Sequence, residues 1–383
     1  MSPEDLDRRI GLVGATAVGV GSMIGAGLFI AFPTAAHAAG RGIWAALAVA
    51  AVVAVCNAWS SARLAARYPS SGGTYVYGRE RLGTGWGVLA GAAFVVGKTA
   101  SLAVMSTAIG RHVWPEHPVV AALVALFVVT LVNLAGVQRS TGALVAIVLV
   151  VLVVVVVAVL RLLDAPAADD ALPTGDVRGV VEAAGVLFFA FAGYARLATL
   201  GGEVRRPERT IPRAIAISVA LVAVVYAASL AALLHALGPT LSSAEAPFPE
   251  ALRDVGAPRL AGLVAVAAVV SAAGALLSLG LGVSRTTYAM ARDGHLPRRL
   301  AVVGRRSGAP WAAELATAAA AAALLVTIDV GSTVVVSSVC VLVYYAVANA
   351  SAATLPGRAG RAVAVGGLVG CLALTLALLT SPL

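Results

Sequence analysis

The sequence has few charged residues and few cysteines. Only 12% of its 383 residues are charged, against about 25% in an ordinary soluble domain, so a soluble fold is excluded. The three cysteines fall inside apolar segments and lack the spacing of metal ligands: Cys56, Cys340 and Cys371. They indicate core packing, and no disulfide framework is expected.

Motifs of enzymes and of ATP-driven pumps are also missing. The sequence contains no Walker loop, no His-Glu-x-x-His motif and no nucleophile elbow. Its five histidines fall near the ends of apolar segments and form no ligand cluster: His37, His112, His117, His235 and His295. We therefore expect no catalytic residues, no metal site and no cofactor.

Apolar residues dominate the chain. They make up 60% of it, the mean hydropathy is +0.95, and the apolar runs repeatedly reach the roughly 20 residues that cross a bilayer. The pattern predicts an all-α polytopic membrane protein, with a single transmembrane domain over residues 1–383 embedded in the lipid bilayer. About eleven spans are expected: 10–36, 42–66, 85–111, 118–137, 141–163, 179–202, 212–237, 259–290, 311–329, 332–354 and 362–380.

The arginines are distributed unevenly between the loops. With the N-terminus in the cytoplasm, the cytoplasmic loops hold eighteen arginines and the outer loops hold six. Such an excess marks the cytoplasmic side of a membrane protein. It accounts for the net charge of +9 without a nucleic-acid partner. We expect a multi-pass protein of the inner or plasma membrane with a cytoplasmic N-terminus.

The first span carries glycines at its centre: Gly19, Gly21, Gly25 and Gly27. Each costs roughly 1 kcal/mol relative to alanine in a helix interior, so the pattern predicts a helix that unwinds half way. Unwound backbone at membrane depth is tolerated only where it lines a cavity or lies buried in protein. This stretch is therefore predicted to form half of a substrate site.

A second interrupted segment lies in the sixth span, five spans after the first. Residues 185–202 are apolar, with a break near Ala192 and Gly193. Interrupted segments at corresponding positions of two halves are typical of a transporter site. Hydropathy and breaks together favour two inverted repeats, with an additional helix after them: 10–163, 179–354 and 362–380.

Two other interpretations of the first-span glycines carry less weight. A dinucleotide fingerprint needs a preceding strand and an acidic residue about 20 positions on. Residues 31–54 contain no Asp or Glu, and the flanks of the motif are membrane spans. Close helix packing in lipid explains Gly19 and Gly21 but does not explain the two glycines of the run 25–27.

Four motifs, in order along the chain, resemble those of the amino acid–polyamine–organocation (APC) transporters. They are Gly21-Ser-Met-Ile-Gly-Ala-Gly-Leu-Phe29, Tyr68-Pro-Ser-Ser-Gly-Gly-Thr-Tyr75, Gly202-Glu-Val-Arg-Arg-Pro-Glu-Arg-Thr-Ile-Pro-Arg-Ala214 and Tyr288-Ala-Met-Ala-Arg-Asp-Gly-His-Leu-Pro297. The resemblance implies a five-plus-five inverted-repeat transporter fold with broken first and sixth helices. It also implies alternating access and an amino acid or amine as the substrate.

By similarity, the substrate lies between the two breaks. A half-helix N-terminus presents unpaired N–H groups and a positive dipole end, which suit a carboxylate. Freed carbonyl groups suit the α-ammonium, and Phe189 or Phe191 would act as an aromatic gate unless both only pack. The expected substrate-binding residues are Met23, Ile24, Gly25, Ala26, Gly27, Phe189, Ala190, Ala192 and Gly193.

Coupling or gating is expected from three side chains within the spans: Lys98, Arg196 and Ser278. Several proton-coupled relatives carry a lysine in the fifth span, where this chain has Val151. Lys98, the only lysine, is then the candidate for proton coupling because desolvation disfavours its charged form; a fixed structural charge is the rival interpretation.

Arg196 also has two interpretations. Facing the cavity, it would favour an anionic or carboxamide side chain on the substrate; facing the cytoplasmic vestibule, it would be a gate partner for Glu203. The serines of the eighth span, Ser271, Ser278 and Ser284, are spread out, which argues against a sodium site, and only Ser278 is expected at cavity depth.

These observations predict a secondary transporter, a permease of small-molecule amino acids that is proton-coupled or exchanging rather than sodium-coupled. Two alternatives stay open. An amine or polyamine permease would need acids in its cavity, and Glu182 is the only acid within the sixth span. A transporter-like amino acid sensor would bind its ligand without moving it, and a signalling extension or a docking tail would mark it.

Overall fold

The computed structural model describes residues 10–25, 27–68, 72–135, 141–168, 172–198, 204–304 and 309–380. Every regular element in these ranges is a helix. Nine helical segments there are long and apolar enough to cross a membrane, and Pro118–Leu134 and Trp311–Thr327 are shorter apolar helices. The predicted all-α, polytopic fold is confirmed.

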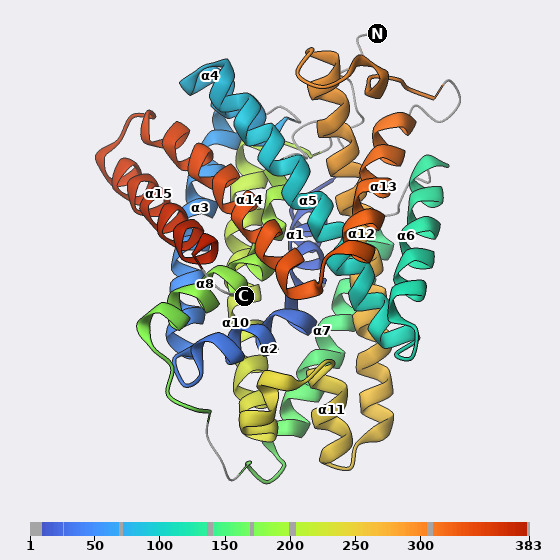
Figure 1. Ribbon diagram of the computed structural model, residues 1–383. Helices are drawn as coiled ribbons and strands as arrows, with labels where there is room; N and C mark the ends of the chain where they lie inside the picture. Colours follow the sequence, from blue (N-terminus) through green and yellow to red (C-terminus); the bar gives the residue numbers. More distant parts are fainter. Residues whose placement is uncertain are drawn as a thin grey trace.

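The helices are labelled in chain order in Figure 1. Their bounds are α1 Leu12–Ile24, α2 Gly27–Ala39, α3 Ile43–Arg67, α4 Gly73–Leu82, α5 Thr84–Val113, α6 Pro118–Leu134, α7 Thr141–Leu163, α8 Val177–Phe191, η1 Ala192–Tyr194, α9 Ala195–Ala198, α10 Pro207–Leu237, η2 Gly238–Ser243, α11 Pro247–Asp254, α12 Pro258–Arg292, η3 Arg298–Leu300, α13 Trp311–Thr327, α14 Val330–Ala353 and α15 Arg358–Leu379.

Both predicted helix breaks are present. The first span is divided into α1 and α2, and Gly25, with φ −34° and ψ −102°, ends the helical run of α1. The sixth span begins as α8, tightens into the 3₁₀ turn η1 at Ala192–Tyr194 and continues as the short helix α9. Backbone groups at each break therefore leave the regular helical hydrogen-bond pattern.

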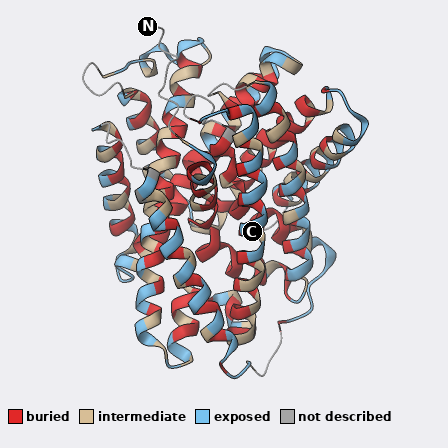
Figure 2. Ribbon diagram, turned by 180° about the vertical axis from the view of Figure 1, so that it is seen from behind, coloured by how far each residue is buried: buried red, intermediate tan, exposed pale blue. Residues whose placement is uncertain are grey.

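The broken helices form the core of the bundle. In the apolar windows of the described spans, 82% of the α1–α2 residues and 83% of the α8–α9 residues are buried, against 28% in α7 and 28% in α15. α1 packs against α7, α10 and α12, and α8 packs against α2, α3 and α14 (Figures 1 and 2). The unwound segments thus lie inside protein, as backbone at membrane depth requires.

The two ends of the bundle are marked by α4 and by α11, which lie at opposite ends in Figure 1. We call these ends the α4 face and the α11 face. At the α4 face, the Tyr75 hydroxyl donates to Asp293 at 2.8 Å, and Arg79 pairs with the same carboxylate at 3.1 Å. These contacts tie α4 to the end of α12.

The Asp293 carboxylate in these contacts stays charged at neutral pH. Burial raises the pKa of Asp293, but the Tyr75 hydrogen bond and the charges of Arg292 and Arg79 outweigh it, so the pKa falls below its usual value. Burial and the bond to Asp293 raise the pKa of Tyr75 to about 12, which keeps its hydroxyl a donor. The contacts of the Asp293 carboxylate stabilise the folded protein fully at pH values above the ordinary pKa of aspartate. This stabilisation is lost as the pH falls through the lowered pKa of Asp293 in the folded protein.

Candidate functional site

A small cavity lies between the two helix breaks, and we call it the central cavity. Its accessible volume is about 20 Å³, room for little more than one water molecule. The lining residues come from the first span, α5, the sixth span and α12: Ser22, Met23, Gly27, Phe94, Lys98, Ser101, Met105, Phe189, Ala190, Gly193, Arg196, Ala275 and Leu279. The cavity must widen before it can hold a molecule of amino acid size.

Two glycines allow the breaks to touch through their backbones. A Cβ atom on Gly27 would lie 2.6 Å from the Ala190 Cα, and one on Gly193 would lie 2.4 Å from the Ser22 carbonyl oxygen. Real Cβ atoms do not approach backbone this closely, so larger residues would push the two spans apart. The glycines that predicted unwinding therefore also set the distance between the breaks.

A tyrosine that the sequence analysis did not identify joins the two breaks. The Tyr226 hydroxyl of α10 lies 2.6 Å from the Met23 carbonyl oxygen and 3.0 Å from the Ala190 carbonyl oxygen. It has one proton and donates to one of them at a time. The sequence could have indicated Tyr226, because a tyrosine in the middle of an apolar helix needs a hydrogen-bond partner for its hydroxyl when it is buried.

Lys98 reaches the other break. Its Nζ donates to the carbonyl oxygen of Ala192 at 3.2 Å, and the Tyr345 hydroxyl lies 3.4 Å from the same oxygen. Ala192 follows the last residue of α8, where the helix dipole is negative and favours a cation. Lys98 is only 4% exposed, so this buried ammonium is held at the end of a half-helix.

Arg196 lines the same cavity from the sixth span. It is 8% exposed, and its Nε donates to the Ser278 Oγ of α12 at 3.3 Å. Lys98 and Arg196 thus contribute two basic side chains to one small cavity. Glu203, the gate partner considered from the sequence, lies outside the described residues.

The remaining expected site residues are placed as follows. Met23, Gly27, Phe189, Ala190 and Gly193 line the central cavity, and Ala192 holds Lys98 through its carbonyl group. Gly25 packs against α12, where an added Cβ would lie 2.6 Å from the Cβ of Ala275. Ala26 lies outside the described residues.

Only one of the two phenylalanines proposed as a gate faces the cavity. Phe189 lines it, whereas Phe191 is fully buried and packs at an angle against Tyr226, with 5.0 Å between ring centroids. A gating role therefore remains a hypothesis for Phe189, and packing accounts for Phe191.

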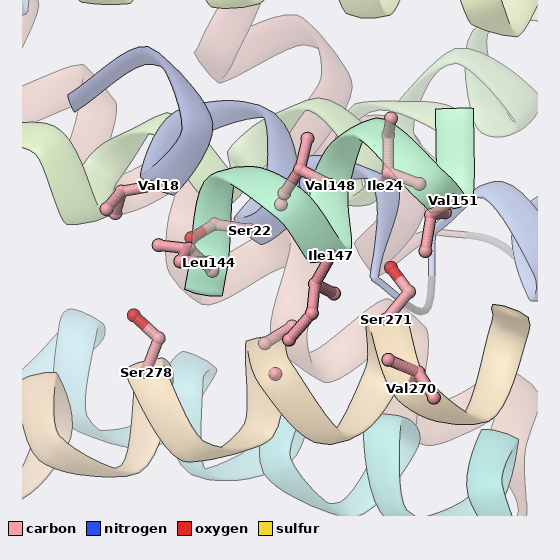
Figure 3. Close-up of a pocket in the computed structure, with 13 residues that line it drawn as sticks. Val18, Ser22, Ile24, Leu144, Ile147, Val148, Val151, Val270, Ser271 and Ser278 are labelled. Carbon is pink, nitrogen blue, oxygen red and sulfur yellow. The ribbon is translucent and has the colours of Figure 1, made fainter. Parts of the chain in front are cut away.

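A second pocket lies between α1, α7 and α12, and we call it the side pocket (Figure 3). Its accessible volume is about 40 Å³, and Ile24 lines it instead of the central cavity. Val151, at the position where the resemblance would put a lysine, also faces it, together with Ser271 and Ser278. Neither Ser271 nor Ser278 is among the residues that line the central cavity, so the expectation that Ser278 lies at its depth stays a prediction.

A polar vestibule opens on the α11 face. It has an accessible volume of about 320 Å³, and its lining includes Thr34 of α2 and Arg111 of α5. Phe29, one helical turn before the vestibule residue Pro33, packs at an angle against His112 and Phe248, with ring centroids 6.3 and 6.1 Å apart. Phe29 is in the first turn of α2, so along this helix the packed rings lie between the first break and the vestibule residues Pro33 and Thr34.

The family model and the three relatives described below are all named as transporters or permeases. Residues 14–354 match the family model described as amino acid permease. An uncharacterized transporter of Mycobacterium tuberculosis is 54% identical over 98% of this chain and 87% of its own length. Cationic amino acid transporter 3, mitochondrial, of Arabidopsis thaliana is 29% identical over 86% of this chain and 59% of its own. The branched-chain amino acid permease BcaP of Bacillus subtilis is 25% identical over 81% and 72%.

Proposed function

The chain belongs to the amino acid permease family, and we propose that it carries amino acids across a membrane by alternating access. The family and the named relatives are transporters rather than enzymes. The main support for this proposal is that residues from both helix breaks line the same central cavity. Such a cavity offers backbone donors and acceptors to the common head group of amino acids.

The head group is proposed to bind through backbone groups. The start of α2 supplies the positive end of a half-helix for the α-carboxylate, with Gly27 in the cavity wall. The carbonyls of Met23 and Ala190, held by Tyr226 in the closed state, supply acceptors for the α-ammonium. The substrate ammonium then replaces the tyrosine hydroxyl as the cavity widens.

Proton coupling or exchange is proposed instead of sodium coupling. Ser271 and Ser278 are seven residues apart on one helix, which separates them by about 10 Å along its axis, too far to ligate one ion together. Val151 gives the side pocket an aliphatic wall and no cation. The buried Lys98 at the second break is the candidate for proton coupling.

The proposed orientation has the α4 face in the cytoplasm and the α11 face outside. The α4 face carries Arg79 and Arg81 in the last turn of α4 and Arg292 at the end of α12. An arginine excess of this kind marks the cytoplasmic side. The inner or plasma membrane is the proposed location, and the outer vestibule would be the entry route.

The purified protein in proteoliposomes tests the function. We expect at least one of the twenty radiolabelled amino acids to accumulate when a proton gradient or an unlabelled internal amino acid is supplied. A sodium gradient alone is expected to drive no uptake. Binding without uptake under every gradient would contradict transport and favour the sensor interpretation.

A further inference from the structure

The central cavity holds two basic side chains and, among its described lining residues, no acidic one. Lys98 enters from α5 and Arg196 from the sixth span. Both are more than nine-tenths buried. Cations are costly at membrane depth and normally mark a substrate or ion pathway.

We propose that the substrate is an amino acid whose side chain ends in a carboxylate or carboxamide oxygen, and that cationic amino acids are rejected. The inference rests on the function proposed above, because it assigns the side-chain pocket of that same site. Its structural basis is the placement of Lys98 and Arg196 in one small cavity with the two helix breaks.

The hydrogen-bonding capacity of Lys98 supports this assignment. An ammonium group has three N–H donors, and Lys98 uses one of them on a described residue, the carbonyl of Ala192. A carbonyl is a neutral acceptor, so this bond does not neutralise the charge. An oxygen of the substrate side chain would give the ammonium a second acceptor, and a carboxylate would also compensate the charge.

The polarity of the cavity wall fits a short side chain with an oxygen at its end. Phe94, Met105 and Leu279 form apolar parts of the wall, which suit the methylene groups of a glutamate or glutamine. A lysine or arginine substrate would bring a second ammonium or guanidinium charge next to the buried Lys98 ammonium. Like charges at short range repel most strongly in such a low-dielectric site.

Competition and uptake in proteoliposomes test the inference with four labelled probes: L-glutamate, L-glutamine, L-leucine and L-lysine. We expect glutamate or glutamine to be taken up at least tenfold faster than lysine. A preference for glutamate indicates recognition of charge, and equal uptake of both indicates recognition of the shared carbonyl oxygen; either result supports the proposal. Uptake of leucine or lysine ahead of both overturns it.

Charge-removing variants locate the source of the preference. Lys98→Met keeps most of the side-chain length and is expected to reduce the preference for glutamate or glutamine over leucine at least tenfold, whereas Lys98→Arg retains it. Arg213→Met is the matched control, because it removes a positive charge from an exposed position on α10. An unchanged preference in Lys98→Met overturns the proposal.

The possible results distinguish failure of the substrate assignment from failure of the proposed transport function. If no amino acid enters the liposomes, the transport function fails; if only leucine or lysine enters, only the substrate assignment fails. If Lys98→Met does not fold, the order in which the wild-type protein takes up the four amino acids still tests the substrate assignment.

Discussion

Gly193→Ala is expected to reduce amino acid uptake about tenfold without preventing the protein from folding. The new Cβ would lie 2.4 Å from the Ser22 carbonyl oxygen and 2.5 Å from its carbonyl carbon. Both atoms belong to the backbone, so relief requires the two breaks to separate. Overpacking of this kind costs about 1–3 kcal/mol, and 1.4 kcal/mol corresponds to about a tenfold change in an equilibrium.

The measurement is the initial rate of uptake in proteoliposomes, with size-exclusion chromatography to check folding. Gly262→Ala is the matched control, since a Cβ at Gly262 of α12 meets nothing within 4 Å. We expect wild-type uptake from this control. Wild-type rates in Gly193→Ala would show that close contact of the two breaks is not required.

Tyr226→Phe is expected to destabilise the substrate-free protein by about 1–3 kcal/mol, the cost of leaving a buried carbonyl without its donor. The phenyl ring keeps the edge contacts with Phe32 and Phe191, so the loss is confined to the hydroxyl. A saturating amino acid substrate should stabilise this variant more than the wild type. The substrate ammonium would then donate to acceptors that Tyr226 no longer occupies.

Thermal unfolding with and without substrate measures both effects. Tyr288→Phe is the control, because the Tyr288 hydroxyl makes no hydrogen bond to a described residue; its unfolding midpoint should match that of the wild type. Equal substrate stabilisation of Tyr226→Phe and wild type would contradict the competition between the hydroxyl and the ammonium.

The positions of the apolar helices and the two breaks could be predicted from the sequence because their causes are local. Apolar runs of span length and glycines in mid-run determine hydropathy and helix propensity within a few turns. The described helices accordingly fall on the expected spans. The resemblance then placed a substrate site between the breaks, where the structure has a cavity.

The partners of the broken helices could not be predicted, because they come from distant parts of the chain. Tyr226 follows Met23 by 203 residues, and the pair Lys98–Ala192 is separated by 94. Which side of α1 faces which neighbour depends on packing, so Ile24 was assigned to the central cavity although it lines the side pocket. Hydropathy alone does not distinguish two apolar faces of a fully buried helix.

The substrate is proposed to bind in the central cavity and not in the side pocket. Substrate protection of single cysteines, in a background with Cys56, Cys340 and Cys371 replaced, tests it directly. Met105→Cys places the thiol in the central cavity and Val270→Cys places it in the side pocket. We expect a transported amino acid to slow the alkylation of Met105→Cys and to leave that of Val270→Cys unaffected. Protection of Val270→Cys alone would contradict it.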